Sequence, residues 1–193
     1  MRILLIRHGE TPGNAKKRYV GGRTDEGISE EGRAQLQEIK AKRKTYPYAK
    51  VYISPMLRCK QTAEVFFGQE TLEVVEDLRE CDFGIFENKN YMELKEEPRY
   101  QEWIDSNATL PFPEGESLEG FQKRVIDAFL AIVEGTEEDL VFVVHGGTIM
   151  SIMYTLCDKR NSYFDWSVKN GCGFYVEYDK ERKKIYVIEE VTG

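Results

Sequence analysis

Two short runs of consecutive apolar residues, at positions 3–6 and 140–144, constrain the fold of this chain most. A short apolar run without polar alternation is typical of a strand that is buried on both faces of a sheet. Residues 51–53 and 72–75 are two further strand candidates. Strands of this kind are expected in a protein whose sheet is covered by helices.

Helical patterns alternate with these strands. Ser29 is a candidate N-cap, and the two glutamates that follow it suit the first turn of a helix. Pro55 is expected to open a second helix, because the N–H that proline lacks would be unpaired in a first turn. The alternation predicts an α/β fold with a largely parallel sheet. The expected helices cover about 29–43, 54–67, 91–95, 100–105, 117–133 and 148–156, and the last two strands cover 173–178 and 184–191.

Composition limits the classes of partner. The 193 residues include 27 Lys and Arg against 34 Asp and Glu, so the net charge is −7. The length suits a single domain over residues 1–193, with no repeat or linker. The acidic balance argues against binding to nucleic acid or to an anionic membrane. It does not exclude an anionic substrate, because a local basic pocket can lie within an acidic protein.

No segment of the chain indicates a membrane span or an export signal. The longest apolar run is far shorter than the roughly 20 residues of a spanning helix, and the apolar start is too short for a signal peptide. We therefore expect a cytoplasmic protein with reduced thiols, although the sequence leaves a disulfide open. The four cysteines, expected to pack as small apolar side chains, are Cys59, Cys81, Cys157 and Cys172.

Only two histidines occur in the chain, and each follows a predicted buried strand. One lies in Arg7-His8-Gly9 and the other in His145-Gly146-Gly147. Ligands of open α/β sheets bind beyond the carboxyl ends of strands, so both imidazoles are expected at a site. The helix after His145 would direct backbone N–H groups, including that of Gly146, at an anionic substrate.

Five segments carry a resemblance to a known family. The segment Arg7-His8-Gly9-Glu10-Thr11 resembles the signature of the histidine phosphatase superfamily, which includes the cofactor-dependent phosphoglycerate mutases. The resemblance implies a three-layer sandwich in which helices flank a central, largely parallel sheet. The other segments, in the same order as in the family, are 54–63, 78–84, 113–117 with Arg124, and 144–147.

The resemblance implies a role for each site residue. His8 would be the nucleophile and would form a phosphohistidine. The side chains of Arg7, Arg58 and His145 would bind the phosphoryl group and stabilise charge on its oxygens, and guanidinium forks match these oxygens well. Glu80 would protonate the leaving alkoxide and then, as a carboxylate, activate water.

Three further expectations concern side chains around the phosphate. A general acid at neutral pH needs a raised pKa, so Glu80 is expected to be buried or to lie near negative charge. Asp82 and Glu87 are nearby rivals for the proton-transfer role. Asn14 is expected to donate a hydrogen bond on the phosphate side, and Thr24 to face the substrate.

Neither a metal nor another cofactor is expected. The sequence has no H-x-H or H-E-x-x-H pattern, and the arginines already supply the positive charge that a metal would bring. It also lacks the glycine-rich patterns of nucleotide-binding folds. The expected partner is a small-molecule phosphate ester, and the sequence leaves the oligomeric state open.

The resemblance favours a phosphatase over a mutase. Mutases usually have Ser and Trp where this chain has Thr11 and Gly13, and Tyr where it has Phe83. The segments 26–29 and 86–88 also depart from the family pattern, at what is expected to be the substrate rim. These departures leave the identity of the leaving group open.

Within the family, residues 83–124 are similar to alpha-ribazole phosphatases of the cobalamin pathway. The similarity is carried by Trp103, by residues 113–117 and by the later Asn170-Gly171-Cys172. The first hypothesis is therefore a metal-independent phosphomonoesterase, with alpha-ribazole 5'-phosphate as a candidate substrate. The alternatives are a phosphoglycerate mutase and a non-catalytic protein that binds phosphorylated ligands.

Overall fold

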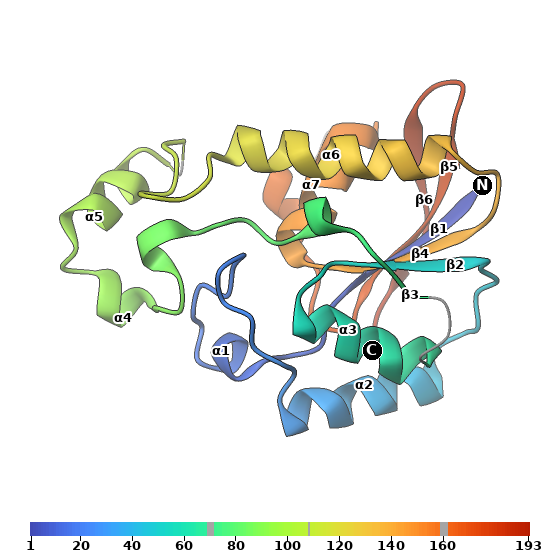
Figure 1. Ribbon diagram of the computed structural model, residues 1–193, viewed down its shortest axis with the longest axis horizontal. Coiled ribbons are helices and arrows are strands. Elements are labelled where there is room, and N and C mark those ends of the chain that lie inside the picture. The colour runs from blue at the N-terminus through green and yellow to red at the C-terminus, as the bar shows by residue number, and fades with distance from the viewer. Residues whose placement is uncertain (69–71, 108, 159–161) are drawn as a thin grey trace.

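Six strands form one sheet in the order β3-β2-β4-β1-β5-β6 (Figure 1). The computed structural model describes residues 1–68, 72–107, 109–158 and 162–193. The first four strands in this order are parallel to one another, and β5 is antiparallel to both of its neighbours, β1 and β6, which confirms the predicted largely parallel sheet. The strands are β1 (Arg2–Arg7), β2 (Lys50–Ile53), β3 (Leu72–Val74), β4 (Leu140–Val144), β5 (Gly173–Asp179) and β6 (Lys184–Val191).

Helices cover both faces of the sheet, which confirms the three-layer arrangement. Helices α2 and α3 pack together on one face, and α6 and α7 pack together on the other (Figure 1). The helices are α1 (Pro12–Ala15), α2 (Glu30–Lys42), α3 (Leu57–Phe67), α4 (Tyr91–Leu94), α5 (Pro98–Asp105), α6 (Leu118–Glu134) and α7 (Gly146–Leu156), with short 3-10 turns at Glu76–Leu78, Gly84–Phe86 and Tyr163–Trp166.

The central strands are buried as the apolar runs predict. All five residues of β4 and residues 3–6 of β1 lie in the main hydrophobic core. The predicted N-cap at Ser29 is also confirmed, because its hydroxyl accepts a hydrogen bond from the Gly32 N–H. The Ser117 hydroxyl caps α6 in the same way. All four cysteines are buried and free, as expected for thiols that pack as small apolar side chains.

The structure corrects two predicted helix starts and adds one helix that was not predicted. Helix α3 begins at Leu57, not at Pro55, and the carboxylate of Asp25 accepts a hydrogen bond from the Leu57 N–H at 2.8 Å. This carboxylate comes from a distant part of the chain, so the local sequence could not reveal that it pairs an N–H group of the first helical turn. Helix α7 begins at Gly146, two residues before the expected start, with His145 as its N-cap. The four-residue α1, fixed by a capping box at Thr11, was not predicted.

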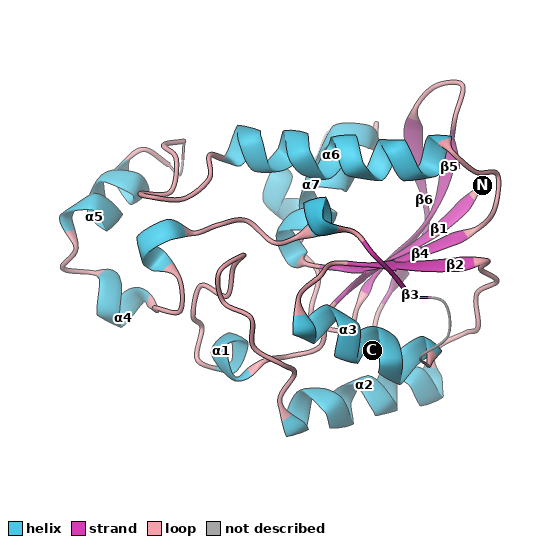
Figure 2. Ribbon diagram, in the orientation of Figure 1, coloured by secondary structure: helices cyan, strands magenta, loops and turns pink. Residues whose placement is uncertain are grey.

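A second, smaller hydrophobic cluster lies apart from the sheet. Figure 2 shows α4 and α5 at the left, beyond the ends of the strands. We call this cluster the aromatic cap. Its members come from short helices and turns, and most of them are aromatic: Tyr19, Phe83, Ile85, Phe86, Leu94, Tyr100, Trp103 and Phe112.

Candidate active site

The two histidines meet because β1 and β4 are parallel neighbours. Arg7 at the end of β1 lies opposite Val144 at the end of β4, so His8 and His145 leave the sheet at the same edge. Their ring centroids are 5.2 Å apart. The structure also places Arg58 of α3 and Arg7 beside these rings, and we call Arg7, His8, Arg58 and His145 the His–Arg cluster.

The ring of His8 is held in one tautomer. Its Nδ1 lies 2.7 Å from the carbonyl oxygen of Gly9, which can only accept, so Nδ1 carries the proton. Burial lowers the pKa of His8 well below its usual value, and the charges of Arg58 and Arg7 lower it further. The neutral ring therefore keeps an unshared electron pair on Nε2.

His145 is fully buried and has partners that the sequence did not reveal. Its Nε2 shares a hydrogen bond of 2.6 Å with the Ser54 hydroxyl, and the Cys59 thiol lies 3.6 Å from the same nitrogen. Burial, followed by the charge of Arg58, lowers the pKa of His145 well below its usual value. Ser54 and Cys59 flank Arg58 in segment 54–63, which was the available signal for their place in the site.

The two arginines of the cluster are held by main-chain carbonyl groups. Arg7 donates from Nη1 to the Val168 carbonyl at 2.7 Å. Arg58 is fully buried, and it donates to the carbonyls of Thr24 at 2.7 Å and Gly21 at 3.1 Å. The Nε of each guanidinium is buried without a hydrogen-bond partner among the described residues. Two cations beside two neutral rings form a site suited to an anion.

Glu80 is the acid that the structure brings to this site. It is 8% exposed, and its carboxylate accepts hydrogen bonds from the N–H groups of Cys81 and Gly147 at 3.0 and 3.2 Å. Burial raises its pKa, against the opposing effect of these hydrogen bonds and of both arginines. A raised pKa is what a carboxyl group needs to hold a proton near neutral pH.

Glu80 lies beside a cavity of about 460 Å³, and its two rivals lie outside the lining of this cavity. The carboxylate of Asp82 binds Arg23 and the Gly84 N–H. The carboxylate of Glu87 accepts from three donors in residues 21–24, the loop that carries the carbonyl partners of Arg58, and from the Phe83 N–H. Both rivals are therefore occupied in holding loops.

The remaining predicted site residues have different positions. Asn14 lines the cavity, and its Oδ1 accepts from Asn170 at 3.2 Å, which leaves its amide nitrogen as a donor. Gly146 also lines the cavity, next to Arg7. Thr24 does not: its hydroxyl donates to Glu87, and its carbonyl holds Arg58.

The cavity has a polar end and an apolar end. Arg7, His8, Asn14, Glu80 and Gly146 form the polar end, while the fully buried His145 and Arg58 lie behind the lining. Side chains of the aromatic cap form the other end, and they are Tyr19, Phe83, Trp103 and Phe112. Further apolar side chains complete the lining, and among them Phe121 lies close to Gly147 and Glu80.

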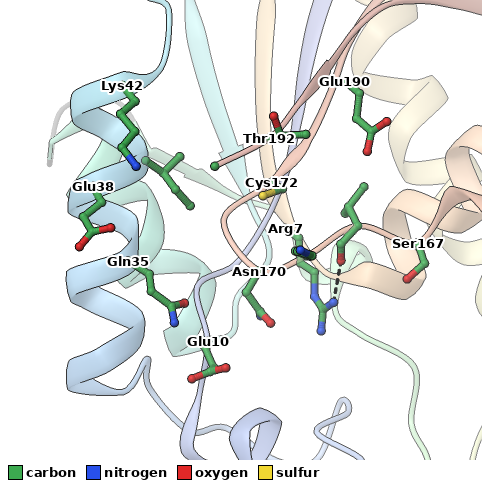
Figure 3. A pocket seen from close by; sticks show the side chains of 14 residues that line it. Arg7, Glu10, Gln35, Glu38, Lys42, Ser167, Asn170, Cys172, Glu190 and Thr192 are labelled. Atoms are coloured by element: carbon green, nitrogen blue, oxygen red, sulfur yellow. Dashed lines mark hydrogen bonds between the residues drawn. The ribbon is translucent and has the colours of Figure 1, made fainter.

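A second cavity of about 900 Å³ lies on the other side of Arg7, between α2 and residues 167–172 (Figure 3). The hydrogen bond from Arg7 to the Val168 carbonyl is visible there. Its charged side chains are of both signs, and neither histidine lines it. The smaller cavity is therefore the candidate active site. The charged lining residues of the larger one are Arg7, Glu10, Glu38, Lys42, Lys169 and Glu190.

The described residues hold neither a candidate metal cluster nor a candidate membrane span. No group of three or more His, Cys, Asp or Glu side chains within the described ranges could hold a metal ion. Among the helices of the same ranges, none has the length and apolarity to cross a membrane. The absence of a cofactor stays a prediction.

Known proteins resemble the chain in sequence. It is 29% identical over 160 residues to "Putative phosphoserine phosphatase 2" of Hydrogenobacter thermophilus, which covers 80% of this chain and 78% of that protein. It is 27% identical over 163 residues to "Probable phosphoglycerate mutase GpmB" of Cronobacter sakazakii, with coverages of 81% and 74%.

Solved structures resemble the fold. The alpha-ribazole phosphatase from Shigella flexneri has a TM-score of 0.86 at 23% identity, over 100% of this chain and 96% of that one. TTHB049 from Thermus thermophilus has a TM-score of 0.73 at 30% identity, over all of both chains. The family model "Histidine phosphatase superfamily (branch 1)" matches residues 3–190. This chain therefore belongs to the histidine phosphatase superfamily, and it is an enzyme of the phosphatase type.

Proposed function

We propose that this protein is a metal-independent phosphomonoesterase that acts through a phosphohistidine on His8. One observation carries the proposal: the Gly9 carbonyl fixes the proton of His8 on Nδ1, in a buried ring whose pKa is depressed. The free Nε2 electron pair is thereby available to a phosphate held beside the two arginines of the His–Arg cluster. An activated nucleophile of this kind splits one difficult displacement into two easier steps.

In the first step, the Nε2 electron pair of His8 forms a bond to phosphorus as the bond to the leaving oxygen breaks. The carboxyl group of Glu80 gives its proton to that oxygen. Arg7 and Arg58 stabilise the charge on the phosphoryl oxygens, which is where most of the catalysis of phosphoryl transfer lies. His145 acts as a neutral hydrogen-bonding ring beside them, and its depressed pKa supports that role.

In the second step, the carboxylate of Glu80 takes a proton from a water molecule, whose oxygen attacks phosphorus. The nitrogen–phosphorus bond breaks, and His8 returns to its neutral form with phosphate released. The burial and raised pKa of Glu80 support both roles, because the same group must hold a proton in one step and accept one in the next.

The apolar end of the cavity supports a bulky, uncharged leaving group, and alpha-ribazole 5'-phosphate is our candidate substrate. Aromatic rings there offer stacking surfaces to an aromatic base. Arg18, the cation on that rim, is already paired with Glu93 and the Asn88 carbonyl. The rim therefore offers little to the carboxylate of phosphoglycerate or phosphoserine.

The test is phosphate release from para-nitrophenyl phosphate in the presence of a chelator, by the unaltered protein and by His8→Ala. We expect release by the unaltered protein and a loss of about 10⁴-fold or more in the variant, as for removal of other covalent nucleophiles. Denaturation under alkaline conditions, which preserve phosphohistidine, should reveal phosphate on the protein in the unaltered form alone.

Three outcomes would contradict the proposed function. Equal activity of both proteins would remove His8 from the mechanism. Transfer of phosphate between glycerate positions, with little loss to water, would identify a mutase. Binding of phosphate esters without turnover would identify a non-catalytic protein.

A further inference from the structure

The segment that carries Glu80 has no regular secondary structure of its own. Residues 79–83 connect two 3-10 turns, Glu76–Leu78 and Gly84–Phe86. No helix or strand ladder fixes the backbone here, so the position of the Glu80 carboxyl depends on contacts from other parts of the chain. Part of this support comes from the N–H of Gly22, which donates to the Cys81 carbonyl at 2.8 Å.

Arg124 of α6 holds the backbone just before Glu80. Its Nη1 donates to the carbonyl oxygens of Asp77 at 2.8 Å and Arg79 at 3.1 Å. The other side of the guanidinium forms a two-pronged ion pair with Glu116, from Nε at 3.0 Å and from Nη2 at 2.8 Å. A paired planar fork fixes direction as well as distance.

Glu116 holds the backbone just after Glu80. One of its carboxylate oxygens accepts a hydrogen bond from the Asp82 N–H at 2.9 Å, and its own N–H donates to the Asp82 carbonyl at 2.9 Å. The ion pair is therefore joined to the main chain on both sides of Glu80. Its side chains are 23% and 28% exposed, so solvent weakens the pair less than it weakens a surface pair.

Arg124 and Glu116 lie outside the lining of the substrate cavity and face a second hollow, which Glu80 also lines. The Arg124 guanidinium lies 5.4 Å from the ring centre of Phe121, whose side chain does line the substrate cavity. The pair therefore acts on the reaction through the groups that it holds and through the charge of Arg124, not by contact with the substrate.

We propose that Arg124 and Glu116 are a positioning pair that holds the Glu80 carboxyl against the leaving oxygen. This inference rests on the proposed function, because it assigns to the pair the proton transfer by Glu80. A shifted Glu80 loop would leave the nucleophile His8 and Arg7 in place while weakening protonation of the leaving group.

The experiment compares kcat/KM for two esters. Phenethyl phosphate has a poor leaving group that needs a proton, whereas para-nitrophenyl phosphate has a good one that does not. Because kcat/KM ends at the first irreversible step, it reports the transfer to His8 without the later hydrolysis. For Arg124→Gln we expect a loss of about 10–100-fold on phenethyl phosphate, part of the full contribution of a general acid. On para-nitrophenyl phosphate we expect less than about threefold.

Further variants separate positioning from stability. Glu80→Gln should show the same selectivity with a larger loss, and Arg124→Lys should restore only part of the activity, since an ammonium cannot hold both carbonyls and Glu116. Glu116→Gln should repeat the pattern even if Arg124→Gln does not fold. Lys123→Gln is the matched control. Lys123 is adjacent to Arg124 on α6, and this variant removes an exposed ion pair with Asp127.

Equal losses on both esters, or no loss on either, in both Arg124→Gln and Glu116→Gln would overturn the positioning role. Failure of the unaltered protein to release phosphate from either ester would instead overturn the proposed function, so the two failures are distinct.

Discussion

The His–Arg cluster and the aromatic cap hold their side chains by different means. In the cluster, main-chain carbonyls fix Arg7, Arg58 and His8 at 2.7 Å each, and the side chains of Ser54 and Cys59 hold His145. In the cap, rings hold one another: the ring centroids of Trp103 and Phe112 are 5.0 Å apart. A main-chain carbonyl remains available as an acceptor when the side chain of its residue is substituted. A contact between two rings is lost when either residue is substituted. The fold therefore fixes the phosphate end and leaves the leaving-group end free to vary.

The largest test of this difference is Arg58→Met. Removing a preorganised cation from developing charge typically costs about 10²–10³-fold in rate. We expect that loss in kcat/KM for small and bulky phosphate esters alike, because the phosphoryl oxygens are the same in each. Arg182→Met, which alters an exposed arginine, is the control and should leave both rates unchanged. A loss confined to bulky esters would contradict the division between the two regions.

The sequence predicted the elements of the cluster but not its anchors. The apolar runs before His8 and His145 are local signals, and they located both rings at one sheet edge. The carbonyl partners of Arg7 and Arg58 lie 161 and 34 positions away, at residues whose side chains are irrelevant to the bond. No residue pattern encodes such a contact, since every residue has a carbonyl group.

The positions of Thr24 and Pro55 show the same limit of prediction from local sequence. Thr24 belongs to the right loop, yet its hydroxyl turns to Glu87 and its carbonyl supports Arg58. Pro55 has the local chemistry of a helix start, but Asp25 pairs the first N–H of α3 two residues later. In both cases the local chemistry identified the segment, whereas tertiary hydrogen bonds determined which atoms of the segment take part in the structure.

A second test uses pH, to which the cluster should respond and the cap should not. Both histidines of the chain are in the cluster, and burial lowers both pKa values in the folded state. Below their unfolded pKa of about 6.5, the two rings bind more protons in the unfolded chain than in the folded chain. The rings therefore make stability fall as pH falls from about 6.5, by up to about 1.4 kcal/mol per pH unit for each ring, while the raised pKa of Glu80 acts in the opposite direction.

Urea unfolding between pH 7 and pH 5 measures this dependence, since the midpoint should fall steadily across that range. His145→Asn removes one titrating ring and should reduce the slope by up to about 1.4 kcal/mol per pH unit. Trp103→Phe, a change in the cap, should shift stability equally at every pH. A slope that His145→Asn leaves unchanged would show that other groups carry the titration.

The smallest expected effect comes from the cap itself. Trp103 packs against Phe112 and Phe86, with ring centroids 5.0 and 5.6 Å apart, and aromatic pairs contribute about 0.5–1.5 kcal/mol. We expect the base of alpha-ribazole 5'-phosphate to stack on Trp103, so Trp103→Ala should reduce kcat/KM for this ester by up to about tenfold relative to glycerol phosphate, which has no aromatic group. Trp103→Phe keeps a ring and should keep most of the preference. Inhibition by inorganic phosphate should not change in either variant, because we expect phosphate to bind at the cluster and not at the cap. Weaker inhibition in Trp103→Ala would show instead that the cap supports the His–Arg cluster, and that the two regions are not independent.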